Sequence, residues 1–256
     1  MSKKKNVVFM LAVKVPQYPW RSEPYKYGIA SWKKWCDKND CELFVLEDLI
    51  HDNDYMKINW QRYYVFDLLE QQGIDYDQIL VIDVDNIVHP DTPNFFEISD
   101  RKFCATHTDG CYDWTFRSME NYSKHLFNGQ MFPFWKYINA GFQIINKDHR
   151  QFYQDIVRFY FENRDKIIWC QENLHVGTDQ PVLNFMLNLS DIPVKLLPYQ
   201  YSMVDMVRKE ILDEEMTFTK CGWVYQFNAI PDNKYADKTM YWMKKTYEHF
   251  HGELDD

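Results

Sequence analysis

The residues with the clearest capacity for chemistry are two aspartates separated by one residue, Asp83 and Asp85. They follow four consecutive apolar residues, 79–82, which is the pattern of a strand buried on both faces. In an extended chain, residues i and i+2 point to the same side, so the two carboxylates would lie together where the strand ends. Carboxylate oxygens suit Mg²⁺ or Mn²⁺, cations that usually accompany phosphates. The pattern therefore favours a metal–diphosphate site.

The Asp-x-Asp spacing alone is weak evidence, because it occurs twice more, at 52–54 and at 75–77. The first copy lies in a polar loop and the second in a turn after Gly73. Since Asp and Asn favour turns, we expect both copies to be solvated turn residues. Only Asp83 and Asp85 follow a buried strand, where a charge is costly without a partner. The plainer interpretation of this pair is that the strand ends there and the acids cap the next turn.

Composition and charge limit the classes of protein that fit this chain. Its 256 residues are 46% hydrophobic, enough for a full core, and we predict a single domain over residues 1–256. The formal net charge of −9 argues against a surface that coats nucleic acid, which is normally basic. Aromatic residues reach 18%, which fits core packing and also a flat site for a sugar or a base.

The first part of the chain alternates strands and helices. Apolar runs predict strands over 6–14, 42–46 and 78–88, and helical spacing predicts helices over about 24–38 and 58–73. This order is typical of a mostly parallel sheet flanked by helices, an α/β fold. The segment between the first strand and the first helix contains three prolines and is predicted to be a loop, at the sheet edge where α/β proteins bind ligands.

The second part is less regular. Residues 108–135 show no periodicity, so we expect a long specificity loop there, although a surface insertion without function fits nearly as well. The possible ligand contacts in this loop are Asp109, Tyr112, Trp114 and Arg117. Further strands are predicted over 102–107, 137–145 and 223–227, with a C-terminal helix over about 233–251 and a core spanning about 6–230.

Two later segments carry polar groups of interest. The strand 137–145 presents Asn139 and Gly141 on one face, and a ligand that approaches the backbone closely would explain the glycine. Farther on, Thr178 or Asp179 can cap a helix. The plain interpretation of Asp179 is that cap, and the functional one is a carboxylate fixed at the edge of an active site.

The sequence does not predict export or a membrane span. The lysines at 3–5 and the apolar run 7–13 resemble a short signal peptide, but no small-residue cleavage site follows, and a buried first strand explains the run better. No apolar run reaches transmembrane length. The six cysteines lack metal-binding spacing, and we expect reduced thiols. The expected location is the cytoplasm, with peripheral attachment to a membrane left open.

Four segments in order resemble the GT-A-fold, metal-dependent glycosyltransferases, in particular the glycogenin-like and bacterial galactosyltransferase-like group of the family eight type. The segments are Ile79–Val88 with its Asp-x-Asp, Asn139-Ala140-Gly141-Phe142, Asp179–Asn184, and Lys57 ahead of them. The resemblance covers about residues 6–230. It implies a single GT-A domain, Rossmann-like, of the nucleotide-diphospho-sugar transferase type, and a reaction that moves a sugar from a nucleotide-diphosphate sugar to a hydroxyl acceptor.

The resemblance also implies roles in holding the donor. Asp85 would ligate a Mn²⁺ or Mg²⁺ ion on the diphosphate, and Asp83 would touch the metal, the ribose or the sugar. Lys57 and Arg62 would add positive charge at the leaving group. The residues implied for the nucleotide sugar, UDP-linked by preference, are Ala12, Val13, Lys14, Tyr18, Lys57, Arg62, Asp83, Val84, Asp85, Asn139, Ala140 and Gly141.

For the reacting centre, the resemblance implies that Asp179 and Gln180 lie beside the anomeric carbon, with Asp179 as the catalytic carboxylate. The acceptor class stays open between a glycan, a lipid-linked sugar, a protein and a modified base. The stereochemical outcome is open as well, because the glycogenin-like group retains configuration and other small GT-A enzymes with similar motifs invert it.

One position departs from the family pattern. The family supplies a late histidine as a further metal ligand, and the position that matches best by context here is Gln226. Its amide oxygen is a weaker ligand for Mn²⁺ than imidazole. His249 and His251, in a segment that spells the family motif better, are the alternatives, although they lie farther along the chain and on the predicted C-terminal helix.

Three other classes compete with this interpretation. A haloacid-dehalogenase-type phosphatase also places Asp-x-Asp after a strand, but that motif normally opens the fold, whereas here two β-α units precede it. A nucleotidyltransferase that forms sugar nucleotides needs a glycine-rich loop after the first strand, and residues 15–24 contain no glycine. A carbohydrate-binding module would explain the aromatic residues but gives no reason for Asp83 and Asp85.

Overall fold

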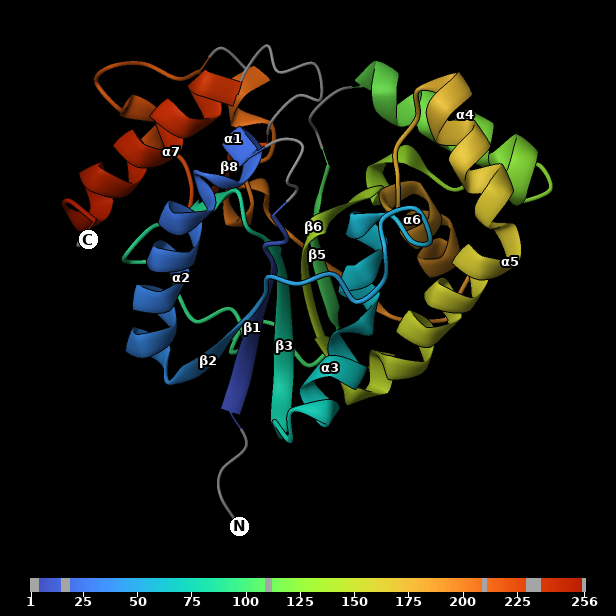
Figure 1. Cartoon of the computed structure of the whole chain (residues 1–256), viewed down its shortest axis with the longest axis horizontal. Coiled ribbons are helices and arrows are strands. Elements are labelled where there is room, and N and C mark those ends of the chain that lie inside the picture. The colour runs from blue at the N-terminus through green and yellow to red at the C-terminus, as the bar shows by residue number, and fades with distance from the viewer. Residues whose placement is uncertain (1–4, 15–18, 109–111, 209–210, 229–235, 255–256) are drawn as a thin grey trace.

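A six-stranded sheet forms the centre of the structure, in the order β2-β1-β3-β6-β5-β7 (Figure 1). The computed structural model describes residues 5–14, 19–108, 112–208, 211–228 and 236–254. All strands run parallel except β6, which is antiparallel to its neighbours β3 and β5. The bounds are β1 (Lys5–Leu11), β2 (Cys41–Leu46), β3 (Tyr76–Asp83), β5 (Phe103–His107), β6 (Ile138–Asn146) and β7 (Val194–Leu197).

Helices cover both faces of this sheet. In Figure 1, α2 lies on one side, and α3, α5 and α6 lie on the other with α4 above them. The helices are α1 (Pro19–Ser22), α2 (Tyr25–Asn39), α3 (Val65–Gln71), α4 (Tyr112–Leu126), α5 (Arg150–Leu174), α6 (Gln180–Asn188) and α7 (Ala236–His251). The 3₁₀ segments are η1 (Ile58–Tyr64), η2 (Phe134–Lys136), η3 (Lys147–His149), η4 (Tyr199–Tyr201), η5 (Met206–Arg208) and η6 (Thr217–Lys220).

Strand β3 is buried on both faces, as its apolar run predicts. Ile79 and Val81 pack into the cluster under α3, α5 and α6, whereas Leu80 and Ile82 pack into the cluster under α2. Alternate side chains therefore join two different cores, which fixes the register of the strand and brings Asp83 to the carboxyl edge of the sheet.

A small ribbon of two antiparallel strands, β4 (Asn86–Val88) and β8 (Val224–Gln226), lies beyond this edge and packs against α7. Its register pairs Asn86 with Gln226. The backbone N–H of Phe227 also donates to the carbonyl of Asp85 at 2.8 Å. The ribbon thus brings Gln226, from late in the chain, beside the two aspartates.

The predicted strand 78–88 ends earlier than expected, at Asp83. Val84 and Asp85 form a turn, and the chain continues in a different sheet at β4. A Cβ atom at Gly28 of α2 would overlap the carbonyl oxygen of Val84, so the helix packs directly against the backbone of this turn. The apolar residues at 84 and 88 are buried in the core under α2 and the one at 87 in the core with α7, which is why the sequence pattern looked continuous.

The predicted loop over 108–135 was wrong in its central part, where helix α4 forms. The buried side of this helix is Thr115, Ser118, Met119, Tyr122 and Ser123. These positions have helical spacing, but small hydroxyl residues occupy most of them, so the apolar period is hidden. In the predicted helix over 58–73, residues 58–64 form a 3₁₀ segment and only residues 65–71 are α-helical.

The other two Asp-x-Asp copies lie at the surface, as predicted, although Asp77 belongs to β3 and not to a turn. Asp75 and Asp77 make exposed ion pairs with Lys147 and Arg101, and residues 52–54 are exposed. Four of the five described cysteines are buried, and all five are free thiols. Within the described ranges, no helix combines the length and the apolarity needed to cross a membrane.

Candidate active site

A cavity of about 600 Å³ opens at the carboxyl edge of the sheet, over the ends of β1 and β3 and the beginning of β6. This is the edge at which open α/β sheets bind ligands. Side chains from β3, the turn after it, η1, β6, α6 and β8 meet there. Those that matter below are Arg62, Asp83, Asp85, Asn139, Gly141, Asp179, Gln180 and Gln226.

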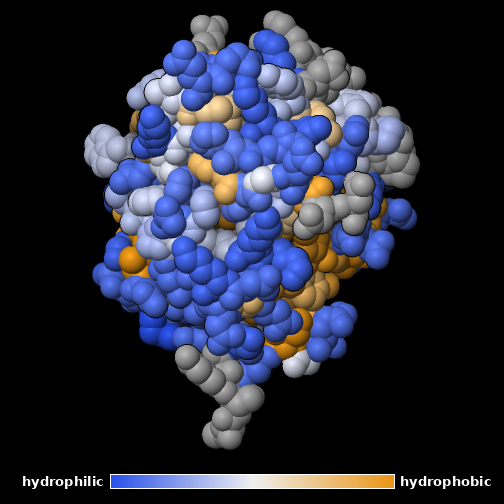
Figure 2. Space-filling model, turned by 90° about the vertical axis from the view of Figure 1, so that its left-hand side faces the viewer, coloured by the Kyte–Doolittle hydropathy of each residue, from blue (hydrophilic) through white to orange (hydrophobic). Residues whose placement is uncertain are grey.

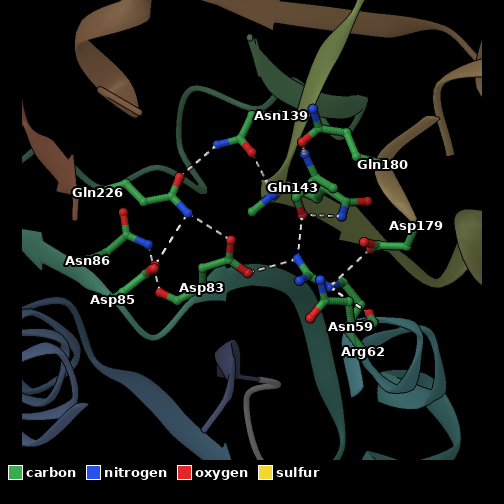
Figure 3. A network of polar contacts seen from close by, with 12 residues as sticks. Asn59, Arg62, Asp83, Asp85, Asn86, Asn139, Gln143, Asp179, Gln180 and Gln226 are labelled. Atoms are coloured by element: carbon green, nitrogen blue, oxygen red, sulfur yellow. Dashed lines mark hydrogen bonds and ion pairs between the residues drawn. The ribbon is translucent and has the colours of Figure 1, made fainter. Parts of the chain in front are cut away.

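Arg62 lies at the centre of the polar network in Figure 3. Segment η1 buries the neighbouring rings of Trp60 and Tyr63, and Arg62 itself is only 5% exposed. Its Nη1 lies 2.9 Å from Oδ1 of Asp83, and its Nε lies 3.4 Å from Oδ2 of Asp179. Burial alone would lower the pKa of Arg62, but the two carboxylates outweigh it and raise that pKa. The buried guanidinium of Arg62 therefore links Asp83 of the Asp-x-Asp motif to Asp179.

Asp179 immediately precedes α6, but its side chain does not cap that helix. Its Oδ2 accepts a hydrogen bond from the Tyr63 hydroxyl at 3.1 Å, and its Oδ1 accepts one from the Thr178 hydroxyl at 2.9 Å. Burial, together with the Asp179 charge, raises the pKa of Tyr63. Asp179 does occupy the predicted N-cap position, but its carboxylate is 2% exposed and directed to Arg62.

The two aspartates of the motif share one amide group. Nε2 of Gln226 lies 2.8 Å from Oδ2 of Asp83 and 3.3 Å from Oδ1 of Asp85. On its other side, Oε1 of Gln226 accepts from Nδ2 of Asn139 at 3.2 Å, and Oδ1 of Asn139 accepts from the backbone N–H of Gly141 at 2.9 Å. Strands β6 and β8 thus position the carboxylates together.

The cavity carries more negative than positive charge among its described lining residues. These charged residues are the arginines Arg21 and Arg62 and the aspartates Asp83, Asp85, Asp179 and Asp205. Burial, followed by the charge of Asp83, raises the pKa of Asp85 to about 7. Desolvation and a neighbouring negative charge both disfavour the ionised form of this carboxyl group.

A divalent cation would supply positive charge that favours the ionised form of Asp85. Mg²⁺ and Mn²⁺ are commonly held by one or two carboxylates, with substrate phosphates completing the shell. Asp83 and Asp85 offer that partial donor set at the floor of the cavity. No group of three or more His, Cys, Asp or Glu side chains is arranged to hold a metal within the described ranges. The pair therefore suits a cation that arrives with oxygen ligands of its own.

Gly141 leaves room for the Asp83 carboxylate, because a Cβ atom there would overlap it. We predict that Gly141→Ala displaces Asp83 and costs about 1–3 kcal/mol of stability through overpacking. We also expect it to lower turnover at least tenfold in the sugar transfer that the sequence resemblance implies. Steady-state kinetics and urea unfolding measure the two effects. Gly73→Ala, at a positive φ of 69° before β3, is the control, since it strains the backbone far from the cavity. Equal turnover in the two variants would contradict this packing role.

Some of the other residues predicted from the sequence line the cavity, and some do not. Val13, Val84, Ala140 and Gln180 line the cavity, and Oε1 of Gln180 accepts from the Ala140 N–H at 2.9 Å. Ala12 is buried in the core under α2. Lys14 is exposed and pairs with Glu47 at 3.5 Å. Tyr18 and Asp109 lie outside the described residues.

Lys57 does not line this cavity. It lines a second one of about 380 Å³ beside Arg164 on α5. His249 is exposed on α7, with Nε2 3.3 Å from the Thr219 hydroxyl, and Nε2 of His251 lies 3.1 Å from the Val88 carbonyl. Neither histidine lines the cavity that holds the aspartates. Of the three candidates for the late position, Gln226 alone is placed beside the pair.

In the predicted specificity segment, Trp114 of α4 lines the cavity, whereas Tyr112 and Arg117 do not. Sequence reasoning missed several neighbours, including Arg21 and Tyr25, which line the cavity from the α1–α2 region. Burial, followed by the charge of Asp85, raises the pKa of Tyr25 to about 12. Tyr63 was missed too, because a tyrosine in a helical pattern gives no signal of a distant carboxylate.

The fold is one that occurs among glycosyltransferases. A crystal structure of a glycosyltransferase involved in the glycosylation of the major capsid of PBCV-1 matches 93% of this chain and 98% of its own, with a TM-score of 0.58 and 9% sequence identity. At that identity, the likeness concerns the fold. No protein-family model matches this sequence, and no curated protein matches it. The predicted α/β class, a mostly parallel sheet flanked by helices, is confirmed.

Proposed function

We propose that this protein is a GT-A-type glycosyltransferase, which moves a sugar from a nucleotide-diphosphate sugar to a hydroxyl acceptor. The observation that carries the proposal is the Asp83–Asp85 pair on the floor of a cavity at the carboxyl edge of the sheet. The fold likeness to a glycosyltransferase supports it independently. A cavity of about 600 Å³ falls within the range of small-molecule sites.

Asp83 and Asp85 would hold Mn²⁺ or Mg²⁺ against the donor diphosphate, and that ion would supply Lewis-acid stabilisation of the leaving group. Asp85 lines the cavity, and burial and the charge of Asp83 raise its pKa, so a cation there would stabilise its ionised form; it is the main ligand in this proposal. Arg62 holds Asp83 in place through Nη1. UDP is the nucleotide we propose for the donor.

Asp179 and Gln180 complete the proposed reacting centre. Both line the cavity at the start of α6, on the other side of Arg62 from Asp83. Gln180 accepts a hydrogen bond from the Ala140 backbone of β6, which joins β6 to the start of α6 in the cavity wall. Asp179 is our proposed catalytic carboxylate, and its bonds to Arg62, Tyr63 and Thr178 hold it in one orientation.

A thermal-shift panel of nucleotide sugars, each with and without Mn²⁺, tests the proposal. We expect a UDP-sugar to raise the melting temperature only when Mn²⁺ is present, because a ligand stabilises the folded state in proportion to RT ln(1 + [L]/Kd). UDP alone with Mn²⁺ should give most of that rise. Release of phosphate from simple phosphate esters, with no response to any nucleotide sugar, would instead identify a phosphatase.

A further inference from the structure

The orientation of the Gln226 amide follows from a group that cannot be turned around. The backbone N–H of Gly141 only donates, so the Asn139 atom 2.9 Å away is the oxygen Oδ1. Its nitrogen Nδ2 therefore faces Gln226 and donates to Oε1 at 3.2 Å. The remaining atom of the Gln226 amide, Nε2, is then the one that faces the two carboxylates (Figure 3).

The opposite orientation would fail at two places. With Gln226 reversed, its Oε1 would face two carboxylate oxygens, and its NH₂ group would face the NH₂ group of Asn139. Reversing Asn139 as well would leave two donors facing each other at Gly141. A cation ligand must present its oxygen, because an amide NH₂ group does not coordinate Mg²⁺ or Mn²⁺.

Burial makes an unfavourable orientation in this chain of hydrogen bonds costly. Asn139 is 5% exposed and Gln226 is 6% exposed, so any group left without a partner there would lose its hydrogen bond without gaining one to water. The strands behind them add rigidity, since Asn139 lies on β6 and Gln226 is paired with Asn86 in the β4–β8 ribbon.

We infer that Gln226 is a positioning residue: its amide N–H groups bridge Asp83 and Asp85, and it is not a ligand of the cation. Both oxygens of Asp83 are then engaged, Oδ1 by Arg62 and Oδ2 by Gln226. The main direct contact with the cation then falls to Asp85 and to oxygens of the bound nucleotide sugar, with Asp83 held beside them. This inference rests on the proposed function only for the presence of the cation.

The side-chain amide resonance of Gln226 in the ¹⁵N-labelled, metal-free protein tests the geometry without any turnover. Its assignment comes from its loss in Gln226→Ala. We expect Asp85→Asn to move this resonance, because one of its two acceptors changes. Gln78, a 5% exposed glutamine on β3 that donates to the Phe96 carbonyl, is the control and should not move. If the chemical shift of the Gln226 amide does not change in Asp85→Asn, the inference is overturned.

Mn²⁺ affinity, read from the electron paramagnetic resonance signal of free Mn²⁺ with and without UDP, gives the second measurement. We expect Gln226→Ala to weaken Mn²⁺ binding about tenfold, as loss of a residue that positions a ligand does, and Asp85→Asn to weaken it at least a further tenfold, since it removes the ligand itself. Equal weakening by the two changes would make Gln226 a ligand and overturn the inference. A wild-type protein that binds no Mn²⁺ even with UDP would refute the proposed metal dependence, and the amide resonance would then decide the role of Gln226 alone.

Discussion

Replacing Arg62 with methionine is expected to cost about 3–5 kcal/mol of unfolding free energy, the range found when one partner of a buried ion pair is removed. Arg62 faces Asp83 and Asp179, so the change leaves two carboxylates without their common counter-charge. It also removes the hydrogen bonds that Arg62 donates to the carbonyl oxygens of Asn59 and Ala140. Methionine retains much of the apolar volume, so lost charge dominates. Urea unfolding followed by circular dichroism measures the effect.

Arg150 provides a matched control for this change. It also faces two carboxylates, Asp67 and Glu70, but its side chain is 37% exposed. Solvent screens such a pair, so Arg150→Met should cost no more than about 1 kcal/mol. A loss in Arg62→Met that is no larger than in Arg150→Met would show that burial of the central arginine contributes nothing.

A second substitution separates charge from packing. Adding Asp179→Asn to Arg62→Met removes one of the two unpaired carboxylates, so the double variant should recover part of the lost stability. The energies of the two changes are then non-additive, as expected for residues in contact. Simple addition of the two single losses would mean that packing, and not the unpaired charge, causes the instability.

The parts of this fold that sequence patterns predict are the ones recorded locally. The apolar run 79–82 predicts a strand because its own residues carry the pattern, and the structure confirms that both faces are buried. The charged pair after it was located for the same reason. By contrast, the reversed direction of β6 depends on its neighbours β3 and β5, and no residue within the strand encodes it.

The connections within the candidate site are the part that sequence could not supply. Arg62 was selected for a phosphate, yet its partners Asp83 and Asp179 come from two distant segments. Lys57, selected by the same reasoning, lines a different cavity. Gln226 was chosen by context as an oxygen ligand, but the direction of its amide depends on Asn139, a residue of another strand. Spacing along a chain does not specify such contacts.

Asp85→Asn is expected to abolish metal-dependent sugar transfer, by at least a hundredfold, and to leave the metal-free protein more stable at alkaline pH. Transfer fails because the amide keeps the shape of the side chain but loses the charge that the cation needs. Stability rises because burial and Asp83 raise the pKa of Asp85 to about 7, so in the wild type an unfavourable charge forms as the pH increases. Asparagine cannot acquire that charge.

The sign of the pH dependence follows from the direction of the shift. The pKa of Asp85 is higher in the folded state than the value of about 3.9 for an unfolded chain. The protonated carboxyl therefore favours folding, and that contribution is complete below about pH 4 and lost as the pH rises through about 7. The advantage of Asp85→Asn should accordingly grow between pH 5 and pH 8, to about 1–3 kcal/mol.

Urea unfolding in EDTA at pH 5 and pH 8, with transfer assays at saturating Mn²⁺, measures both halves of this prediction. Asp77→Asn is the control, because Asp77 belongs to a surface copy of the same Asp-x-Asp spacing and pairs with Arg101 at 2.8 Å in solvent. It should keep both transfer and the wild-type pH dependence. If Asp85→Asn loses transfer and gains stability at pH 8, the Asp85 carboxylate destabilises the metal-free protein and is required for the reaction. Both results are expected of a cation ligand. If it transfers sugar normally, the metal role proposed for the pair is wrong.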